Sequence, residues 1–535
     1  MTTRTLFIGM DGATFTVLDQ LTNDLPGVGV VMPFLSEFLR NGVRAKLRST
    51  PNPLTPPAWV SLMTGRTPGH HGVFDFIRAE EKGGDVFFTL YDARDIRTET
   101  IWSLASRQGK TIAALNFPFT APPPRDVDGS VVPGFIPWKH LRRNTHPQDL
   151  YDQIKQGVAD FDPKELAWDF DREAQSLEDL SDEDRENWVR YHLPREMQWF
   201  RIARYLLETK QPDLMAVMFD GVDKLQHQAW RFLDPALFSD HPTPYEQRMR
   251  DLCFEYFRKL DGYIKELVTL VGPEAQVFMA SDHGFTATTE VIRINAYLKQ
   301  KGYLEWRAVG QSEAEQRRDA TMFANLDWDK TLAYCRTPSS NGITIRVART
   351  PGETGIAPAQ YETFRDQLIR DLEQLTDPAS GERIITEIHK REDVFPGVAM
   401  SDAPDLLMVL RDRGFVSIKN IEPVVEPRPE PAGTHHPDGI FIAGGQGINQ
   451  GREIGTRNIV DVGATLLYSL GLAVPEDLEG QVPEESFTEA WLSAHPVRIG
   501  PPTHSVGGNE AGAEDMSEEE KEKLMEQLQM LGYME

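Results

Sequence analysis

Polar side chains of the types that bind metal ions follow, or closely precede, a series of short apolar segments in this sequence. In chain order they are Asp11, Asp223, His227, Asp282, His283, His435 and His436. Asp223 and His227 lie four residues apart, so a helix would place both on one face, although surface ion pairs use the same spacing. A charged pair such as Asp282-His283 directly after a buried strand is costly unless it is used. Together these groups predict a metal site built from carboxylates and imidazoles.

One threonine is surrounded by prolines. The segment PNPLTPPAWVSLMTG (51–65) places four prolines around Thr55. Proline fixes φ and removes backbone donors, so Thr55 is held on a stiff turn at the start of an expected helix. Taken alone, this composition favours a proline-rich loop that enters a helix. A nucleophile at a helix N-terminus, where anions are favoured, is the alternative, and it depends on the rest of the chain.

The elements that must position these groups alternate between strands and helices. Apolar runs predict strands at 5–10, 111–117, 213–219, 275–280 and 439–445, and helical periodicity predicts helices at 195–210 and 244–271. This alternation favours an α/β fold with a mostly parallel central sheet flanked by helices. Ligands of such sheets gather at the carboxyl ends of the strands, which is where the polar side chains stand.

The chain divides into a core, a cap and a tail. We expect a catalytic core at 1–300 and 431–495, a helical insertion in it at about 140–195, a smaller α+β cap at 301–430, and a linker with a C-terminal amphipathic helix at 496–535. Ser517 and Glu520 form a capping-box pattern before that last helix. Leucines on one helical face predict that it docks on the body or on a partner subunit, which would make the protein a homo-oligomer.

The charge and cysteine content of the chain limit the classes of partner and of metal site that it can have. The 535 residues carry a formal net charge of −26, which repels nucleic acid duplexes and anionic membranes, so an anionic substrate needs local positive charge. Two cysteines, Cys253 and Cys335, are too few for a disulfide framework or a cysteine-rich metal site. No apolar run approaches the roughly 20 residues that span a bilayer, and no signal peptide is visible. We therefore expect a cytoplasmic protein.

A family resemblance joins the motifs. In chain order they read GMDG, PLTPPAWVSLMTGRTPGHHGVFDF, DGVDKLQHQAW, SDHGF and GTHHPDGIFIAGG. This series resembles the alkaline phosphatase superfamily, and most closely the prokaryotic phosphohydrolase or phosphomutase members of its type I phosphodiesterase/nucleotide pyrophosphatase branch. LDWDKTLAYC and APDLLMVL, in the expected cap, look like the same branch, so the resemblance covers nearly the whole chain. It implies an alkaline-phosphatase-like fold with cap insertions.

The resemblance also implies a metal-dependent phosphohydrolase with two divalent ions, usually zinc, although manganese would also accept a mixed His and Asp set. Carried over by position, one ion would be held by Asp11, Thr55, Asp282 and His283, and the other by Asp223, His227 and His435. Thr55 would be the nucleophile, activated by the metal, and a phospho-threonine intermediate would be hydrolysed by water. The spacing Asp-x-x-x-His selects Asp223 over Asp220, and Gly-Thr-His selects His435 over His436.

The net charge of the expected metal site indicates which class of phosphate ester it would bind. Two divalent ions are balanced by three aspartates and a threonine alkoxide, which suits a singly charged phosphodiester better than a monoester unless another cation helps. We therefore expect a small phosphodiester substrate. Lys224, beside Asp223, is the first candidate for an additional catalytic cation, followed by Arg66 and Arg78, and a solvated surface charge is the alternative for each.

The sequence differs from nucleotide pyrophosphatases and from sulfatases at particular positions, and other functions remain as alternatives. Asp75 and Phe76 stand where nucleotide pyrophosphatases carry a phosphate-binding asparagine, so nucleotide specificity does not transfer. Trp59 stands where a sulfatase needs arginine, which argues against a sulfatase. A phosphomonoesterase or phosphomutase of the same superfamily, or a non-catalytic member that binds an anion or a partner, remain the alternatives.

Overall fold

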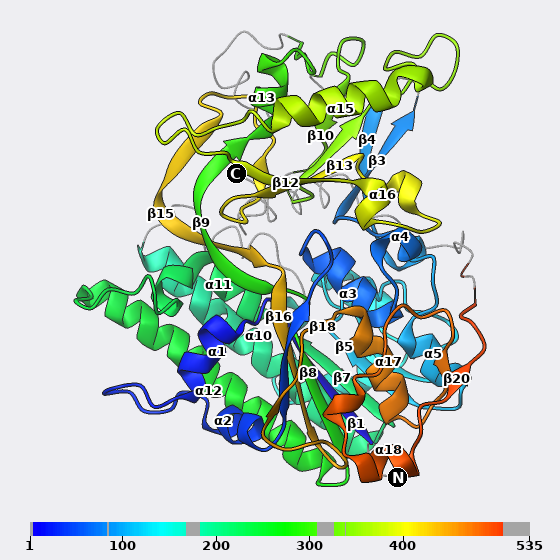
Figure 1. Ribbon diagram of the computed structural model, residues 1–535. Helices are drawn as coiled ribbons and strands as arrows, with labels where there is room; N and C mark the ends of the chain where they lie inside the picture. The colour runs from blue at the N-terminus through cyan, green and yellow to red at the C-terminus, as the bar shows by residue number, and fades with distance from the viewer. Residues whose placement is uncertain are drawn as a thin grey trace.

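The computed structural model describes residues 4–82, 85–166, 182–307, 326–337, 339–504 and 506 (Figure 1). Within them, the largest sheet has nine strands. In spatial order they are β17 (Arg452–Glu453), β2 (Val43–Arg48), β16 (Asp438–Gly445), β8 (Gln276–Ala280), β1 (Thr5–Met10), β7 (Leu214–Phe219), β5 (Ile112–Leu115) and β6 (Gly129–Val132), with β18 (Arg457–Asn458) also paired to β2. Strand β16 runs antiparallel to its neighbours β2 and β8, and the other pairs are parallel.

Helices cover both faces of this sheet. One face carries α1 (Phe15–Thr22), α2 (Pro33–Arg40), α10 (Asp182–Thr209), α11 (Gly221–Leu233) and α12 (Pro244–Val271), and the other carries α3 (Thr55–Thr64), α5 (Ile101–Arg107) and α17 (Val460–Ser469). Leu6 and Ile8 of β1 pack in the core of the first face and Phe7 in the core of the second. Burial on both faces explains why these strands are continuous apolar runs. The predicted α/β fold is confirmed.

A smaller antiparallel sheet forms a second layer beyond the core (Figure 1). Its strands are β10 (Ala333–Cys335), β11 (Gly342–Ile345), β13 (Leu406–Leu410) and β12 (Ile385–Lys390), accompanied by α13 (Ile294–Gln300), α15 (Tyr361–Leu372) and α16 (Arg391–Val394). These elements share their own apolar core, to which Ile294 and Leu298 of α13 contribute. The expected boundary at residue 300 falls at the end of that helix.

Several further elements are short. They are α4 (Pro68–His71), β3 (Ile77–Lys82), β4 (Asp85–Leu90), α6 (Trp138–Asn144), α7 (Leu150–Gly157), α8 (Pro163–Leu166), α18 (Glu489–Ala494), β19 (Val474–Pro475) and β20 (Ile499–Gly500). Helices α6 to α8 fall in the segment expected to be a helical insertion. The expected C-terminal helix lies outside the described residues. No helix among the described residues is long and apolar enough to cross a bilayer.

Two long strands connect the core to the cap. Strand β9 (Gly284–Arg293) starts directly after Asp282-His283, and β15 (Val425–His436) returns antiparallel to it, with β14 (Val416–Ser417) on the other side. The register pairs His435 with Phe285, so the end of β15 lies beside the start of β9. Figure 1 shows this pair curving from the central sheet to the cap. Strand pairing therefore brings His435 next to His283.

A glycine in the central strand lets the helix that carries Thr55 approach the sheet. A Cβ atom on Gly9 of β1 would lie 2.7 Å from Cη2 of Trp59 and 2.8 Å from Cγ of Met218. Trp59 belongs to α3, four residues after Thr55, and is fully buried. The missing side chain at residue 9 thus fixes the distance between α3 and the strand that ends at Asp11.

We predict that Gly9→Ala lowers the free energy of unfolding by about 1–3 kcal/mol, because the added methyl group overpacks Trp59 and Met218. The matched control is Gly262→Ala on α12, where a Cβ meets nothing within 4 Å. There the higher helix propensity of alanine should stabilise the protein by up to about 1 kcal/mol. Urea denaturation measures both, and equal effects of the two substitutions would contradict this account of Gly9.

Candidate active site

The predicted polar residues meet at one edge of the central sheet. Asp11 follows β1, Asp282 and His283 follow β8, and α11, which follows β7, carries Asp223 and His227. Because β1, β7 and β8 are parallel neighbours, their carboxyl ends lie side by side. All five side chains are buried. The strand-end rule therefore places groups from distant segments in one site.

The proline-rich segment contacts two histidines of this edge. Thr55 is the first residue of α3, and its Oγ1 lies 3.3 Å from Nε2 of His283. Two residues earlier, the carbonyl oxygen of Pro53 accepts a hydrogen bond of 2.7 Å from Nδ1 of His435. That bond holds the proton of His435 on Nδ1, so Nε2 presents a lone pair to the site. The carbonyl of Gly284 does the same for Nδ1 of His283, at 3.0 Å.

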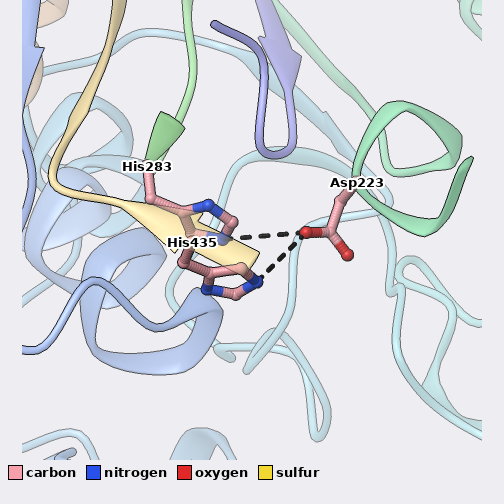
Figure 2. Close-up of side chains that lie close together, drawn as sticks. All are labelled: Asp223, His283 and His435. Atoms are coloured by element: carbon pink, nitrogen blue, oxygen red, sulfur yellow. Dashed lines mark ion pairs between the residues drawn. The ribbon is translucent and has the colours of Figure 1, made fainter. Parts of the chain in front are cut away.

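Two groups of ligand-type atoms share His283. In the first, Nε2 of His283 lies 3.2 Å from Oδ2 of Asp282 and 3.6 Å from Oδ1 of Asp11. In the second, Oδ1 of Asp223 lies 3.3 Å from Nε2 of His435 and 3.9 Å from Nε2 of His283 (Figure 2). The rings of His283 and His435 stack with their centroids 3.6 Å apart. The two groups are therefore adjacent.

His227 completes the second group. Its Nε2 atom lies 3.5 Å from Oδ1 of Asp223 and 3.1 Å from Nε2 of His435. The ring of Phe285 packs edge-on against His227 and also contacts His435. Phe285 thus walls the site with an apolar ring, which reduces the access of water to the three polar groups.

The electrostatics of the site favour bound cations. Burial, together with the negative charges of Asp282 and Asp223, raises the pKa of Asp11 well above its usual value. Burial raises the pKa of Asp282 to about 8. Burial also acts to raise the pKa of Asp223, but His227 and His435 outweigh it and hold that pKa well below its usual value. Burial lowers the pKa values of His283 and His435, so both rings are neutral at pH 7.

Two carboxylate oxygens indicate that the site suits a metal ion. Oδ1 of Asp11 and Oδ2 of Asp282 are buried and accept no hydrogen bond from any described residue. The other oxygen of Asp282 accepts a bond of 3.1 Å from the backbone N–H of Gly12, which orients the carboxylate. Buried oxygens left in this way are costly unless a cation binds them. The donor set, of carboxylates and neutral imidazoles, fits divalent ions such as zinc or manganese.

The seven residues predicted as metal ligands are thus brought together by the structure. Their assignment as ligands stays a prediction. His436 does not join them, since its Nδ1 accepts a hydrogen bond of 3.0 Å from the backbone N–H of Asp438. Asp220 is likewise separate, because Arg195 binds its carboxylate through two hydrogen bonds of 3.2 and 2.9 Å.

Lys224 lies in this neighbouring ionic cluster. Its Nζ atom is 3.2 Å from Oδ2 of Asp220, and the side chains of Lys224, Asp220 and Arg195 are almost fully buried. Burial alone would raise the pKa of Asp220, but Arg195 and Lys224 outweigh it and lower that pKa. Part of the positive charge of Lys224 is therefore balanced by Asp220.

The other two candidate cations pair elsewhere. Arg66 lies 2.7 Å from the carboxylate of Asp477. Arg78 forms an ion pair with Asp95.

Sequence reasoning missed two members of the ionic cluster. Asn116, with a positive φ of 66°, directly follows β5 and donates a hydrogen bond of 3.0 Å to Asp220. The strand-end rule that found Asp11 would have found it. Arg195 gave no signal, because it belongs to a helical segment rich in charged residues whose buried face is set only by tertiary packing.

Asp75, a position at which the sequence differs from the expected nucleotide pyrophosphatase motif, joins the core to the cap. Its Oδ1 accepts hydrogen bonds from Oγ of Ser339 at 2.9 Å and from the N–H of Phe76 at 2.6 Å, and Oγ1 of Thr337 donates to Oδ2. Burial raises the pKa of Asp75 to about 6, and these donors reduce the effect. The residue therefore fastens the cap loop that contains Thr337 and Ser339 to the core.

We predict that stability depends on pH through Asp75. Because its pKa is raised from 3.8 to about 6 on folding, the folded chain binds this proton more tightly than the unfolded chain, and stability from this group falls as pH rises through that interval. Asp75→Asn carries no charge, so its free energy of unfolding relative to wild type should increase by up to about 3 kcal/mol between about pH 4 and pH 6. Urea denaturation at several pH values measures this, with the exposed Asp240→Asn as control. A difference that does not change with pH would contradict it.

The chain resembles known proteins both in its match to a family model and in its fold. The chain matches the family model for type I phosphodiesterase/nucleotide pyrophosphatase over residues 5–438. Human ectonucleotide pyrophosphatase/phosphodiesterase 5 superposes with a TM-score of 0.51 at 15% identity, covering 91% of this chain and 100% of that chain. Phosphonoacetate hydrolase from Sinorhizobium meliloti 1021 has a TM-score of 0.48 at 14% identity, covering 88% and 95%. No curated protein matches the chain in sequence.

The structural likeness to the human protein supports the fold alone, whereas the family match spans both the core and the cap. The chain belongs to the type I phosphodiesterase/nucleotide pyrophosphatase family, whose enzymes hydrolyse phosphoric ester bonds.

Proposed function

We propose that this hydrolase is a metal-dependent phosphodiesterase that acts on small phosphate esters through a phospho-threonine intermediate on Thr55. One observation carries the proposal. Oγ1 of Thr55 lies 3.3 Å from Nε2 of His283, and His283 belongs to both groups of buried Asp and His side chains. A hydroxyl group in that position would lie beside the cations, and a bound cation lowers the pKa of a hydroxyl group and so activates it as a nucleophile at neutral pH.

Two divalent ions are proposed to bind at the two groups. Asp11, Thr55, Asp282 and His283 would hold one, and Asp223, His227 and His435 the other. When bound, such ions lower the pKa of a neighbouring hydroxyl group and stabilise charge on phosphoryl and leaving-group oxygens. The proposal favours zinc because the donors mix imidazole and carboxylate, and manganese would also be accepted.

The chain's own groups position the attack. Leu54 caps α3 with extended backbone, so Thr55 begins the helix and its hydroxyl faces His283. Pro56 and Pro57 have no N–H, so the dipole of α3, rather than hydrogen bonds from these two residues, favours an anion here.

The proposed reaction has two steps. Oγ1 of Thr55 forms a bond to phosphorus as the bond to the leaving alcohol breaks, and the proton that Thr55 gives up ends on that alcohol. A water then attacks phosphorus, the bond to Oγ1 breaks, and a proton of that water returns to Thr55, so the products are an alcohol and a phosphomonoester.

The charge of the site supports a diester substrate. Three aspartates and a deprotonated Thr55 balance the four positive charges of two divalent ions, so a second negative charge on the substrate is not compensated by the ligand set. Lys224 is the first candidate for an extra cation, and Asp220 balances part of its charge at 3.2 Å. This site is therefore better suited to a monoanionic phosphodiester than to a dianionic monoester.

We predict that Thr55→Ala lowers kcat/KM for bis-p-nitrophenyl phosphate by at least about 10³-fold, because the nucleophile is removed. Thr55→Ser keeps a hydroxyl and should retain part of the activity. Thr289→Ala, at an exposed position of β9, is the matched control and should leave activity unchanged. Activity of Thr55→Ala close to wild type would rule out the nucleophile, and a preference for p-nitrophenyl phosphate over the diester would rule out the diesterase assignment.

Metal binding should also stabilise the fold. Cations relieve the repulsion among the buried carboxylates Asp11, Asp223 and Asp282, so adding zinc or manganese to EDTA-treated protein should raise the melting temperature and restore activity. Elemental analysis should find two ions per chain. Asp282→Asn should bind fewer than two ions, whereas the exposed Asp240→Asn should bind two. Full activity after EDTA treatment, with no metal by elemental analysis, would contradict metal dependence.

A further inference from the structure

A second charged site lies at the junction of the core and the cap. It is a cavity of about 420 Å³ whose wall includes Arg78, Arg94, Arg97 and Arg336 together with Asp95 and Asp402. Arg78 comes from β3, which lies beside the cap in Figure 1, and Arg336 follows β10 of the cap. The cavity is therefore assembled by segments far apart in the sequence.

Three of the four arginines have carboxylate partners. Arg78 pairs with Asp95 and Arg97 with Asp402, whereas Arg94 bonds Asp92 through Nε at 2.9 Å. These contacts hold the guanidinium groups in place around the cavity. With Asp92 counted beside the two aspartates of the wall, four arginines meet three carboxylates, so one positive charge, that of Arg336, is in excess.

Arg336 is different from the other three. It is half-buried, and it forms no ion pair with any residue in the described part of the chain. Its Nε atom is buried and has no hydrogen-bond partner among the described residues. A buried N–H group left in this way is costly, and an anion in the cavity would satisfy it.

The chemistry of the cavity favours phosphate. The planar fork of arginine binds phosphate through two parallel hydrogen bonds, and several such forks face one small volume. On a chain with a formal net charge of −26, anions are repelled in general, so a local excess of arginine is needed to attract one. The volume lies in the range of small-molecule sites and holds a phosphate with a small group attached.

This cavity is connected to the segment that carries Thr55. Thr337, next to Arg336, contacts Asp75, and the carbonyl of Ser339 accepts a hydrogen bond of 3.0 Å from Nδ2 of Asn52. Asn52 stands three residues before Thr55. The cap loop with Arg336 is thus braced against the proline-rich segment.

We propose that this cavity binds a phosphate group, with Arg336 as its principal ligand. The phosphate comes either from a second phosphate group of the substrate, which rests on the proposed function, or from a free phosphate compound that binds as an effector.

Binding of inorganic pyrophosphate to the full-length protein in EDTA tests the proposal, because EDTA removes metal ions that would bind the probe. Isothermal titration calorimetry should show one site in wild type. Arg336→Gln should weaken it by at least about tenfold, because a charged bidentate contact is lost. Arg336→Lys should lose less. Arg349→Gln, an exposed arginine of the cap, is the matched control and should bind as wild type does.

Arg97→Gln provides a second variant should Arg336→Gln fail to fold, and it should also weaken binding. Absence of binding to wild type, or equal affinity of wild type and the folded variants, overturns the proposal. This measurement needs no catalysis, so its result is independent of whether the protein proves to be a phosphodiesterase.

Kinetics with excess metal then identify the source of the phosphate. Two p-nitrophenyl phosphodiesters that differ only in a second phosphate group serve as substrates. If the substrate supplies it, Arg336→Gln raises KM for the doubly phosphorylated ester alone. If an effector supplies it, pyrophosphate changes the rate with the simpler ester in wild type and not in Arg336→Gln. A variant that behaves as wild type in both assays contradicts a role of the cavity in either form.

Discussion

The burial of three carboxylates in one small volume is the constraint on which this structure depends. Asp11, Asp223 and Asp282 are at most 4% exposed and lie around His283. Mutual repulsion and desolvation make this arrangement unfavourable for the protein alone, as the raised pKa values of Asp11 and Asp282 show. Such a site persists when the fold holds it firmly and when cations bind it. The parallel strands, the proline-rich segment and the strand pair to the cap are the means of holding it.

These supports act on different residues. The central strands fix Asp11 and Asp282 by backbone pairing, and Gly9 lets Trp59 bring α3 close enough for Thr55 to reach His283. The carbonyl of Pro53 then orients His435, so the stiff segment positions both the hydroxyl group of Thr55, which we propose as the nucleophile, and a histidine. The stiffness that proline gives the chain thus has a chemical use.

The local features of this site could be predicted from sequence, and the long-range ones could not. Asp11 and Asp282 could be predicted because each follows a continuous apolar run. Such runs are typical of strands that are buried on both faces. The path of β15 could not be predicted from the sequence. Its prolines cannot donate hydrogen bonds to a neighbouring strand, and its pairing with β9 shifts register between Pro427 and Ala432. Likewise, Asp220 and Lys224 show ion-pair spacing in the sequence, but Arg195, the second cation that binds Asp220, is supplied by another helix. The resemblance of motifs, rather than periodicity, identified His435.

The same limit applies to the arginine cavity, whose members come from the core and the cap and share no sequence pattern. Arg336 directly precedes Thr337, which binds Asp75, so one cap loop contributes both to the junction with the core and to the wall of the cavity.

The central claim is that two cations bind side by side at the carboxyl edge of the sheet. Anomalous diffraction at the zinc edge, from crystals grown with zinc, tests it most directly. The account predicts two peaks, one bounded by Asp11, Thr55, Asp282 and His283 and the other by Asp223, His227 and His435. Peaks absent from these positions, or a single peak at full occupancy, would contradict it.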